Sequence, residues 1–229
     1  MHLFRSDRYA SIDVDASPHL STRLGNLGRQ YVINSGSNLL QQERRCYRHL
    51  SRDCAIYQWT APGCVLEELL VAFTPSRLTL PPDIKCQALV VRLQALASIQ
   101  TLDAELSWQP GYRWIDGFGE PGEGLEARSW SDEVWSVVVG TEDSEFLAGR
   151  SRAGRWMPRR FSAYFEMYAE DVVQVRYDSL SVHLPELESG EDCQFQFVNA
   201  SGPRQYSDSE MWLAVDQKPE TLLAAGDCQ

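Results

Sequence analysis

The sequence lacks an excess of positive charge. It carries 21 Lys and Arg residues against 32 Asp and Glu residues, which gives a formal net charge of −11. Nonspecific binding to nucleic acid depends on clustered cations that neutralise phosphates. This charge balance therefore predicts that nucleic acid is not a partner.

Long hydrophobic runs are also missing. Residues 1–17 contain no apolar stretch of the kind a signal peptide needs, and no later segment provides about 18 consecutive apolar residues. We therefore expect neither secretion nor membrane insertion, and a cytoplasmic or nuclear location. In such a compartment cysteines stay reduced. We expect six free thiols, at Cys46, Cys54, Cys64, Cys86, Cys193 and Cys228.

Motifs for catalysis or metal binding are scarce. Cys46 and His49 have C-x-x-H spacing, but no second close pair follows to complete a zinc cage. There is no G-x-S-x-G elbow, and His183 falls on the polar face of a predicted strand. Glu67 and Glu68 are adjacent, so on a strand they point to opposite faces and cannot easily flank one glycosidic bond. We predict no enzyme, no cofactor and no metal; a carboxylate pair assembled from distant loops is the alternative.

What the sequence does contain is a series of short segments typical of strands. Apolar and polar side chains alternate in them with a period of two, or β-branched and aromatic residues are concentrated. Turn residues such as Gln109-Pro110-Gly111 separate the segments. The predicted strands cover residues 89–93, 104–108, 134–139, 161–168, 173–177, 180–184 and 193–197.

This pattern predicts an all-β fold. Many short strands without a long 3.6-residue period favour an antiparallel β-sandwich, jelly-roll-like, with one or two short helices. Its two apolar sheet faces should close over one shared interior. We expect short helices at 39–48 and 64–72. The chain divides into an extension at 1–29, a sandwich at 30–204 and a second extension at 205–229, where residues 211–215 could add a strand.

Five arginines gather around Trp156 in this acidic chain. Guanidinium groups bind sulfate, phosphate or acidic peptides through paired hydrogen bonds, so the cluster is a candidate anion-binding site. The alternative, which we favour, is a solvated hairpin that balances the acidic segment 132–145. The cluster consists of Arg150, Arg152, Arg155, Arg159 and Arg160.

One of the seven tryptophans stands out. Trp114 lies in a loop rich in Gly and Pro and is a candidate exposed platform, whereas most of the others should be in the core. The apolar face of a pyranose packs on such a ring while nearby amides and hydroxyls fix its hydroxyl groups. A carbohydrate is therefore one ligand class that this loop fits.

A resemblance to a known family comes from several motifs in the same order. The chain resembles the domain of phloem protein 2 and the tobacco-type (Nictaba-like) plant lectins from residue 30 to about 204. The motifs are Gln30-Tyr31-Val32-Ile33-Asn34; Cys46-Tyr47 with Leu50, Arg52, Ile56 and Trp59; residues 65–73 and 88–92; Gly154-Arg155-Trp156-Met157 with Tyr164-Phe165; and residues 171–177.

This resemblance implies a function. A member of the family would be a non-catalytic lectin of the nucleus or cytoplasm that binds N-acetylglucosamine-containing or related glycans. Trp59 would be the stacking or framing ring, with Tyr57, Arg52 and Trp114 as neighbours. The partners would be glycans or glycoproteins. The alternative is a protein-interaction adaptor of the ubiquitin-ligase type that keeps the scaffold without sugar binding.

Overall fold

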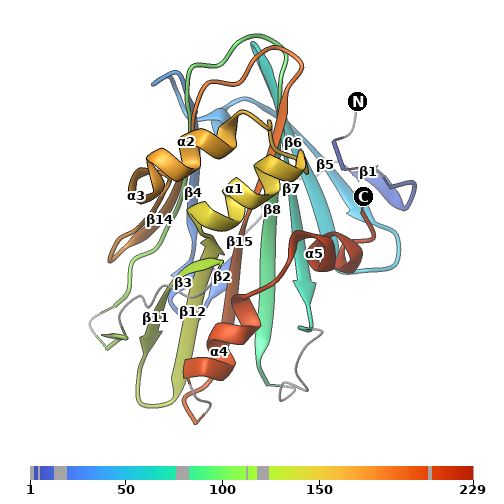
Figure 1. Ribbon diagram of the computed structural model, residues 1–229. Coiled ribbons are helices and arrows are strands. Elements are labelled where there is room, and N and C mark those ends of the chain that lie inside the picture. Colours follow the sequence, from blue (N-terminus) through green and yellow to red (C-terminus); the bar gives the residue numbers. More distant parts are fainter. Residues whose placement is uncertain are drawn as a thin grey trace.

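The computed structural model of the 229-residue chain describes residues 3–4, 6–12, 20–75, 83–111, 113–117, 124–205 and 208–228. One layer is a nine-stranded antiparallel sheet (Figure 1). Its strands, in spatial order, are β1 (Tyr9–Ile12), β5 (Glu43–His49), β6 (Cys54–Ala61), β7 (Cys64–Phe73), β8 (Lys85–Ala95), β15 (Asp192–Pro203), β12 (Trp135–Glu142), β11 (Leu125–Ser131) and β10 (Ile115–Asp116).

A smaller antiparallel sheet forms the second layer. Its four strands, in spatial order, are β13 (Val173–Val175), β14 (Ser179–Leu184), β9 (Leu102–Ser107) and β4 (Gly28–Ile33). A two-stranded ribbon of β2 (Ser21–Thr22) and β3 (Gly25–Asn26) precedes β4. The predicted all-β antiparallel sandwich is confirmed.

Helices are more numerous than expected. They comprise the 3₁₀ turn η1 (Leu39–Gln41), α1 (Ser144–Ala153), α2 (Phe161–Met167), α3 (Ala169–Val172), α4 (Asp208–Val215) and α5 (Pro219–Ala225). Helices α1 to α3 connect β12 of the large sheet to β13 of the small one. Within the described part of the chain, none of the helices has the length and apolarity needed to cross a bilayer.

Local capping explains where α1 begins and ends. The Asp143 side chain accepts a hydrogen bond from the Phe146 amide at 2.7 Å, which satisfies one free donor of the first turn. Gly154 follows the last turn with φ of 64°, a left-handed conformation that glycine adopts without a steric penalty. The arginine-rich segment therefore contains a capped helix and not the predicted hairpin.

Four local predictions are wrong. Residues 64–72 form strand β7 because both faces of this strand are covered, which gives the continuous apolar run that also fits a helix. Residues 39–48 contain only the turn η1 and then β5. Segment 161–168 is mainly helix α2, whose Phe161 and Phe165 are buried on one face at i, i+4 spacing. Residues 211–215 belong to helix α4 and add no strand.

The main hydrophobic cluster fills the space between the two sheets. Inward side chains of β7, β8 and β15 meet those of β9 and β14 there, and helix α2 closes one end with its two phenylalanines. Large members of this cluster include Tyr31, Trp130, Phe161, Phe165, Phe195 and Phe197.

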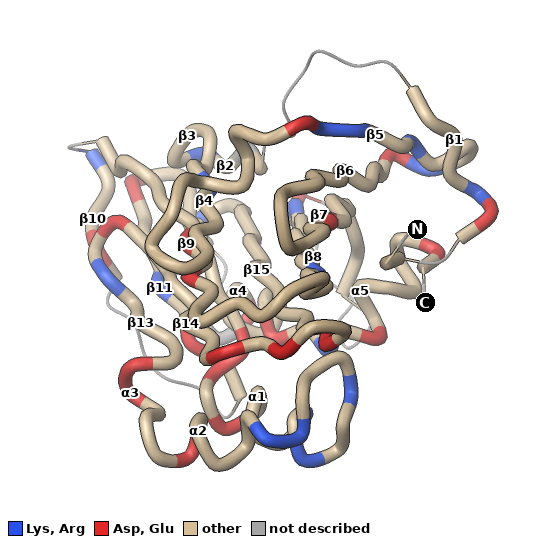
Figure 2. The backbone as a smooth tube through the Cα atoms, turned by 90° about the horizontal axis from the view of Figure 1, so that it is seen from above, with Lys and Arg blue, Asp and Glu red and all other residues tan. Residues whose placement is uncertain are grey.

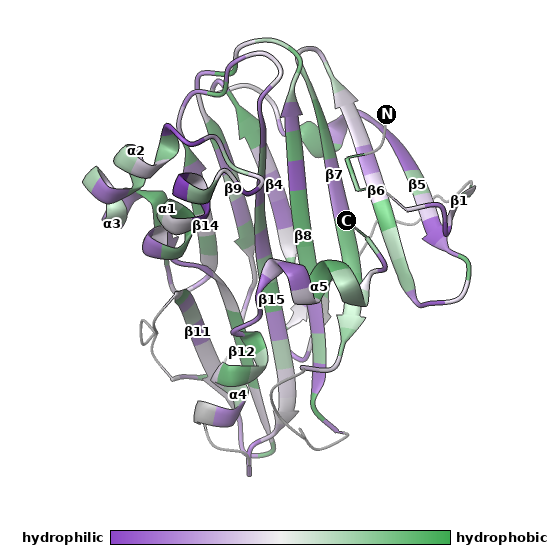
Figure 3. Cartoon of the chain, turned by 45° about the vertical axis from the view of Figure 1, so that its right-hand side comes forward, coloured by the Kyte–Doolittle hydropathy of each residue, from purple (hydrophilic) through white to green (hydrophobic). Residues whose placement is uncertain are grey.

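A second hydrophobic cluster lies on the other face of the nine-stranded sheet. Outward residues of β6, β7, β8 and β15 pack there against Phe4 and against apolar residues of α4 and α5, which lie across that sheet (Figure 3). The expectation of one shared interior is therefore incomplete, because segments predicted as extensions cover a second apolar face.

Candidate functional site

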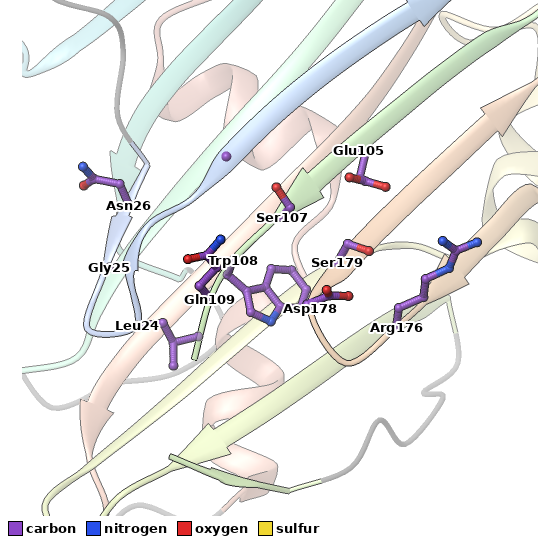
Figure 4. A pocket seen from close by; sticks show the side chains of 11 residues that line it. Leu24, Gly25, Asn26, Glu105, Ser107, Trp108, Gln109, Arg176, Asp178 and Ser179 are labelled. Atoms are coloured by element: carbon purple, nitrogen blue, oxygen red, sulfur yellow. The ribbon is translucent and has the colours of Figure 1, made fainter. Parts of the chain in front are cut away.

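An open cavity of about 630 Å³ lies at one end of the four-stranded sheet (Figure 4). Three segments that are distant in the sequence supply its wall: the β2–β3 ribbon, the end of β9 and the β13–β14 turn. Its lining residues are Leu24, Gly25, Asn26, Gly28, Glu105, Ser107, Trp108, Gln109, Arg176, Asp178 and Ser179.

A glycine in β4 lets this wall form. Gly28 lies opposite Ser107 in the antiparallel register of β4 and β9. A Cβ atom at Gly28 would lie only 2.7 Å from the Ser107 Oγ atom. The absence of a side chain at position 28 therefore leaves the Ser107 hydroxyl uncovered by its cross-strand neighbour.

Trp108 forms the back wall of the cavity. Its side chain is only 3% exposed, its ring packs edge-to-face on Trp130 at 4.8 Å between centroids, and its Nε1 donates to the Tyr177 carbonyl at 3.0 Å. These contacts hold the β13–β14 turn against the end of β9. Because so little of the ring is exposed, Trp108 shapes the cavity without offering a broad stacking surface.

The rest of the lining is rich in hydrogen-bonding groups. Hydroxyls come from Ser107 and Ser179, amides from Asn26 and Gln109, and charges from two carboxylates and one guanidinium. The Glu105 carboxylate accepts a 3.4 Å hydrogen bond from Gln30, and Arg176 donates to Gln174 at 2.9 Å. Such a mixture of donors and acceptors suits a ligand with many hydroxyl groups.

The polar surface continues along the sheet beyond the cavity. In β9 the inward residues are buried while Asp103, Glu105 and Ser107 are partly exposed. The residues directly opposite them on β14 are His183, Ser181 and Ser179, so all six side chains share the outer face. On the other side of β9, Gln30 lies opposite Glu105. We call this surface, together with the cavity, the outer polar face.

Three residues of the outer polar face form a hydrogen-bonded chain. The Asp103 carboxylate lies 2.7 Å from His183 Nδ1, and His183 Nε2 lies 3.1 Å from the Ser181 Oγ atom. The carboxylate favours a proton on Nδ1, so Nε2 accepts from the serine hydroxyl. The expectation that His183 lies on the polar face of its strand is confirmed.

The trio of Asp103, His183 and Ser181 has the residue types of a serine hydrolase triad, but its environment differs from that of a hydrolase active site. Ser181 is only 5% exposed, and it lies in a strand flanked by two ladders, with Gln174 of β13 on one side and Glu105 of β9 on the other. Backbone N–H groups near it are used in strand pairing, whereas acyl transfer needs such donors aimed at an oxyanion. The arrangement fits binding better than nucleophilic attack.

The residues that the lectin resemblance singled out are not brought together on the surface. Trp59 and Tyr57 point into the main hydrophobic cluster and are 3% and 6% exposed. Trp114 is 7% exposed, so the expectation of an exposed platform is wrong. Arg52 donates to the carbonyls of Ala224 and Ala225 at 3.2 and 2.6 Å, and so holds the end of α5.

The arginine cluster is largely neutralised by carboxylates. Arg150 is buried and its NH1 donates to both oxygens of Glu142 at 2.7 and 2.6 Å. Three of the other arginines form ion pairs on the surface. Basic residues gather in α1 and in the loop that follows it (Figure 2). The pairs are Arg152–Glu166, Arg155–Glu220 and Arg160–Glu191; Arg159 is exposed beside Gly154.

The adjacent carboxylates of β7 lie on opposite faces of the sheet, as predicted. Glu68 points between the two sheets, where Tyr31 donates to it at 2.6 Å and Arg29 lies 3.1 Å away. Glu67 points to the other side and accepts hydrogen bonds from the Leu3 and Phe4 amides, both at 2.8 Å. The two groups therefore cannot act on one bond.

The cysteines are buried and unbridged. Burial raises the pKa of Cys64 to about 11 and that of Cys86 to about 12, which keeps both thiols protonated near neutral pH. Over the residues that the structure places, no group of three or more His, Cys, Asp or Glu side chains is arranged to hold a metal ion. The C-x-x-H pair at Cys46 and His49 thus has no described companions for a zinc site.

Comparisons with known proteins place the fold alone. No protein-family model and no curated protein matches the sequence. Eighteen chains of solved structures match, among them one described as "Putative kojibiose phosphorylase from human microbiome", with a TM-score of 0.52 and 7% sequence identity. The match covers 96% of this chain and 30% of that chain, so the present chain spans less than a third of that protein's length. What this chain is similar to is therefore the β-sandwich of a much longer protein.

Proposed function

We propose that this protein is a non-catalytic carbohydrate-binding module whose site is the cavity of the outer polar face. The observation that carries the proposal is the lining itself: hydroxyls, amides and carboxylates from three separate segments converge on an open cavity of about 630 Å³. Sugar hydroxyls both donate and accept, so a site for them needs mixed partners of this kind. Glycans that contain N-acetylglucosamine, or related glycans, are the first ligands to test.

Two features support binding in preference to catalysis. Glu67 and Glu68 are separated by the sheet, and each is already occupied by protein groups. Ser181 lies in a strand that pairs with described strands on both sides, where backbone N–H groups serve the ladders and are not gathered toward an oxyanion. The proposal does not depend on the kojibiose phosphorylase, because an identity of 7% relates the folds and not the sites.

The proposal also moves the sugar site away from the position that the lectin resemblance implied. Trp59 is in the core, so its replacement would act on folding. Asp178 is exposed and lines the cavity, and no side-chain partner for it occurs among the described residues. A free carboxylate of this kind is available to accept hydrogen bonds from ligand hydroxyls.

The test is a glycan array followed by titration calorimetry on the strongest hit. We expect saturable binding, and we expect Asp178→Asn to weaken it about tenfold or more, since a hydrogen bond to a charged group contributes about 1.5–3 kcal/mol. The matched control is Glu145→Gln, which removes one carboxylate from a cavity of about 640 Å³ beside α1. This control should bind like the natural protein.

Two outcomes would overturn the proposal. Equal weakening by both variants would mean that net charge, and not the cavity, governs binding. A blank array, together with a protein that co-purifies and is released by Asp178→Asn, would favour the adaptor function on the same face.

A further inference from the structure

The outer polar face extends well past the cavity, and its far end carries a second group of oriented polar side chains. Ser107 lines the cavity, and Asp103 lies four residues earlier on the same strand. At about 3.4 Å per residue, the two are separated by roughly 14 Å along β9. A single sugar ring in the cavity would leave this second group uncovered.

From this we infer that Asp103, His183 and Ser181 form a second subsite, and that the ligand is a neutral or basic oligosaccharide that runs along β9 and β14. This inference rests on the proposed carbohydrate-binding function. It adds a chain-length requirement and a charge requirement that the cavity alone does not impose.

Two of the three side chains of the second subsite are accessible, whereas Ser181 is buried behind them. The His183 side chain is 33% exposed and the Asp103 side chain is 45% exposed. Asp103 uses Oδ1 for the histidine, and its second oxygen has no partner among the described residues. The exposed imidazole ring offers a flat surface, and the free carboxylate oxygen offers an acceptor for a sugar hydroxyl.

The side chains of the second subsite are also held in place. Asp103 fixes one imidazole nitrogen of His183 and Ser181 fixes the other, at 2.7 and 3.1 Å. A ring held from both sides loses little conformational entropy when a ligand packs on it. Glu105 lies opposite Ser181 and between Asp103 and Ser107, so hydrogen-bonding groups continue without a gap from the second subsite to the cavity.

The charge of the face selects against acidic glycans. Asp103, Glu105 and Asp178 supply three carboxylates, and Arg176 is the single guanidinium among the described residues of the outer polar face. Asp171 and Glu170 of α3, which packs on β14, add further negative charge nearby. Uronate, sulfate or sialate groups would be repelled along the whole path.

The experiment uses the full chain and an array of mono-, di- and tetrasaccharides of glucose, mannose and N-acetylglucosamine, with uronate-containing tetrasaccharides alongside. We expect the preferred neutral tetrasaccharide to bind about tenfold or more tightly than its monosaccharide. Asp103→Asn and His183→Gln should remove that gain and leave monosaccharide affinity within about twofold. Thermal unfolding of both variants checks that the fold is retained.

The results separate this inference from the proposed function. Equal affinity for the monosaccharide and the tetrasaccharide would overturn the second subsite and leave the carbohydrate-binding function standing. Preference for the uronate-containing chains would overturn the charge requirement. An array without any hit would overturn both proposals. If Asp103→Asn disturbs folding, His183→Gln alone decides whether the gain with chain length depends on this group.

Discussion

The outer faces of the two sheets both carry polar side chains. These side chains are buried on one face and partly exposed on the other. On the nine-stranded sheet a polar row crosses four neighbouring strands and is sealed by Leu3 and Phe4 of the N-terminal segment and by Trp156. On the four-stranded sheet the polar row is partly exposed and continues into an open cavity. The sealed row consists of Gln58, Glu67, Arg92 and Gln194, which lie opposite one another in register.

Most polar groups of the sealed row have protein partners, although the buried Gln194 Nε2 atom has none among the described residues. Glu67 accepts from the Gln58 amide and from the Leu3 and Phe4 backbone, and Arg92 donates to Gln194 and to the Leu3 carbonyl, both at 2.7 Å. Burial of a charge is costly unless it is paired in this way. In the described part of the chain nothing comparable covers Asp103, Glu105 and Ser107 of the open row, so these groups are available to water or to a ligand. The comparison separates polar residues that hold the fold together from those that can recognise something else.

The largest expected effect on stability comes from a substitution in the sealed row. Arg92→Ala should lower the free energy of unfolding by about 3–5 kcal/mol, because it leaves the Gln194 side-chain oxygen and the Leu3 carbonyl without their donor and removes the positive charge opposite the buried Glu67. Arg176→Ala on the open face should change the same quantity by about 0.5 kcal/mol or less. Urea unfolding of both variants measures the contrast. A loss of less than about 1 kcal/mol for Arg92→Ala would mean that the sealed row is not a structural device.

A smaller expected effect is the pH dependence of stability that comes from another buried carboxyl group. Glu142 lies on the same covered face, and burial raises its pKa although the Arg150 guanidinium partly opposes that rise. The folded state then holds a proton that the unfolded state has already released. Its contribution to stability is therefore full below the unfolded value of 4.5 and is lost as pH rises through the folded pKa.

The variant Glu142→Gln tests the direction of this pH dependence. Between pH 4.5 and neutrality we expect the free energy of unfolding to fall less steeply with rising pH in the variant than in the natural protein. One group contributes at most about 1.4 kcal/mol per pH unit to that slope. Glu68, whose pKa burial also raises, keeps part of the slope in place. Identical slopes for the two proteins would show that Glu142 is ionised in the fold at low pH.

The two faces also differ in how far the sequence predicts them. Alternation in 180–184 and 104–108 correctly indicated which side chains of β14 and β9 point outward, because these strands have one wet face. In β7 both faces are covered, so this strand carries no alternation, and the prediction of a helix over 64–72 was wrong. The sealed row could not be recognised in the sequence for the same reason.

The cavity itself could not be predicted from local pattern. Its residues come from the β2–β3 ribbon, the start of β4, the end of β9 and the β13–β14 turn, and the pairing of β9 with both β4 and β14 brings them together. The tryptophans illustrate the same limit. Trp114 lies in a loop whose composition suits a sugar platform, and the lectin resemblance assigned such a role to Trp59, but tertiary packing buries both. Burial of a large aromatic residue depends on which strands surround it, and that information is nonlocal.

A small effect on stability is also expected at Gly28 of the open face. An added Cβ would meet the Ser107 Oγ atom at 2.7 Å, and a serine hydroxyl can rotate away at little cost, so Gly28→Ala should change the free energy of unfolding by about 1 kcal/mol or less. The rotated hydroxyl and the new methyl group would nevertheless alter the cavity wall. We therefore expect glycan affinity, measured by calorimetry, to fall about tenfold while the thermal transition stays cooperative. Gly111→Ala is the matched control, since its Cβ would meet nothing within 4 Å. A large loss of stability without a change in affinity would place Gly28 with the residues that hold the fold, and would remove the distinction between the two faces at this position.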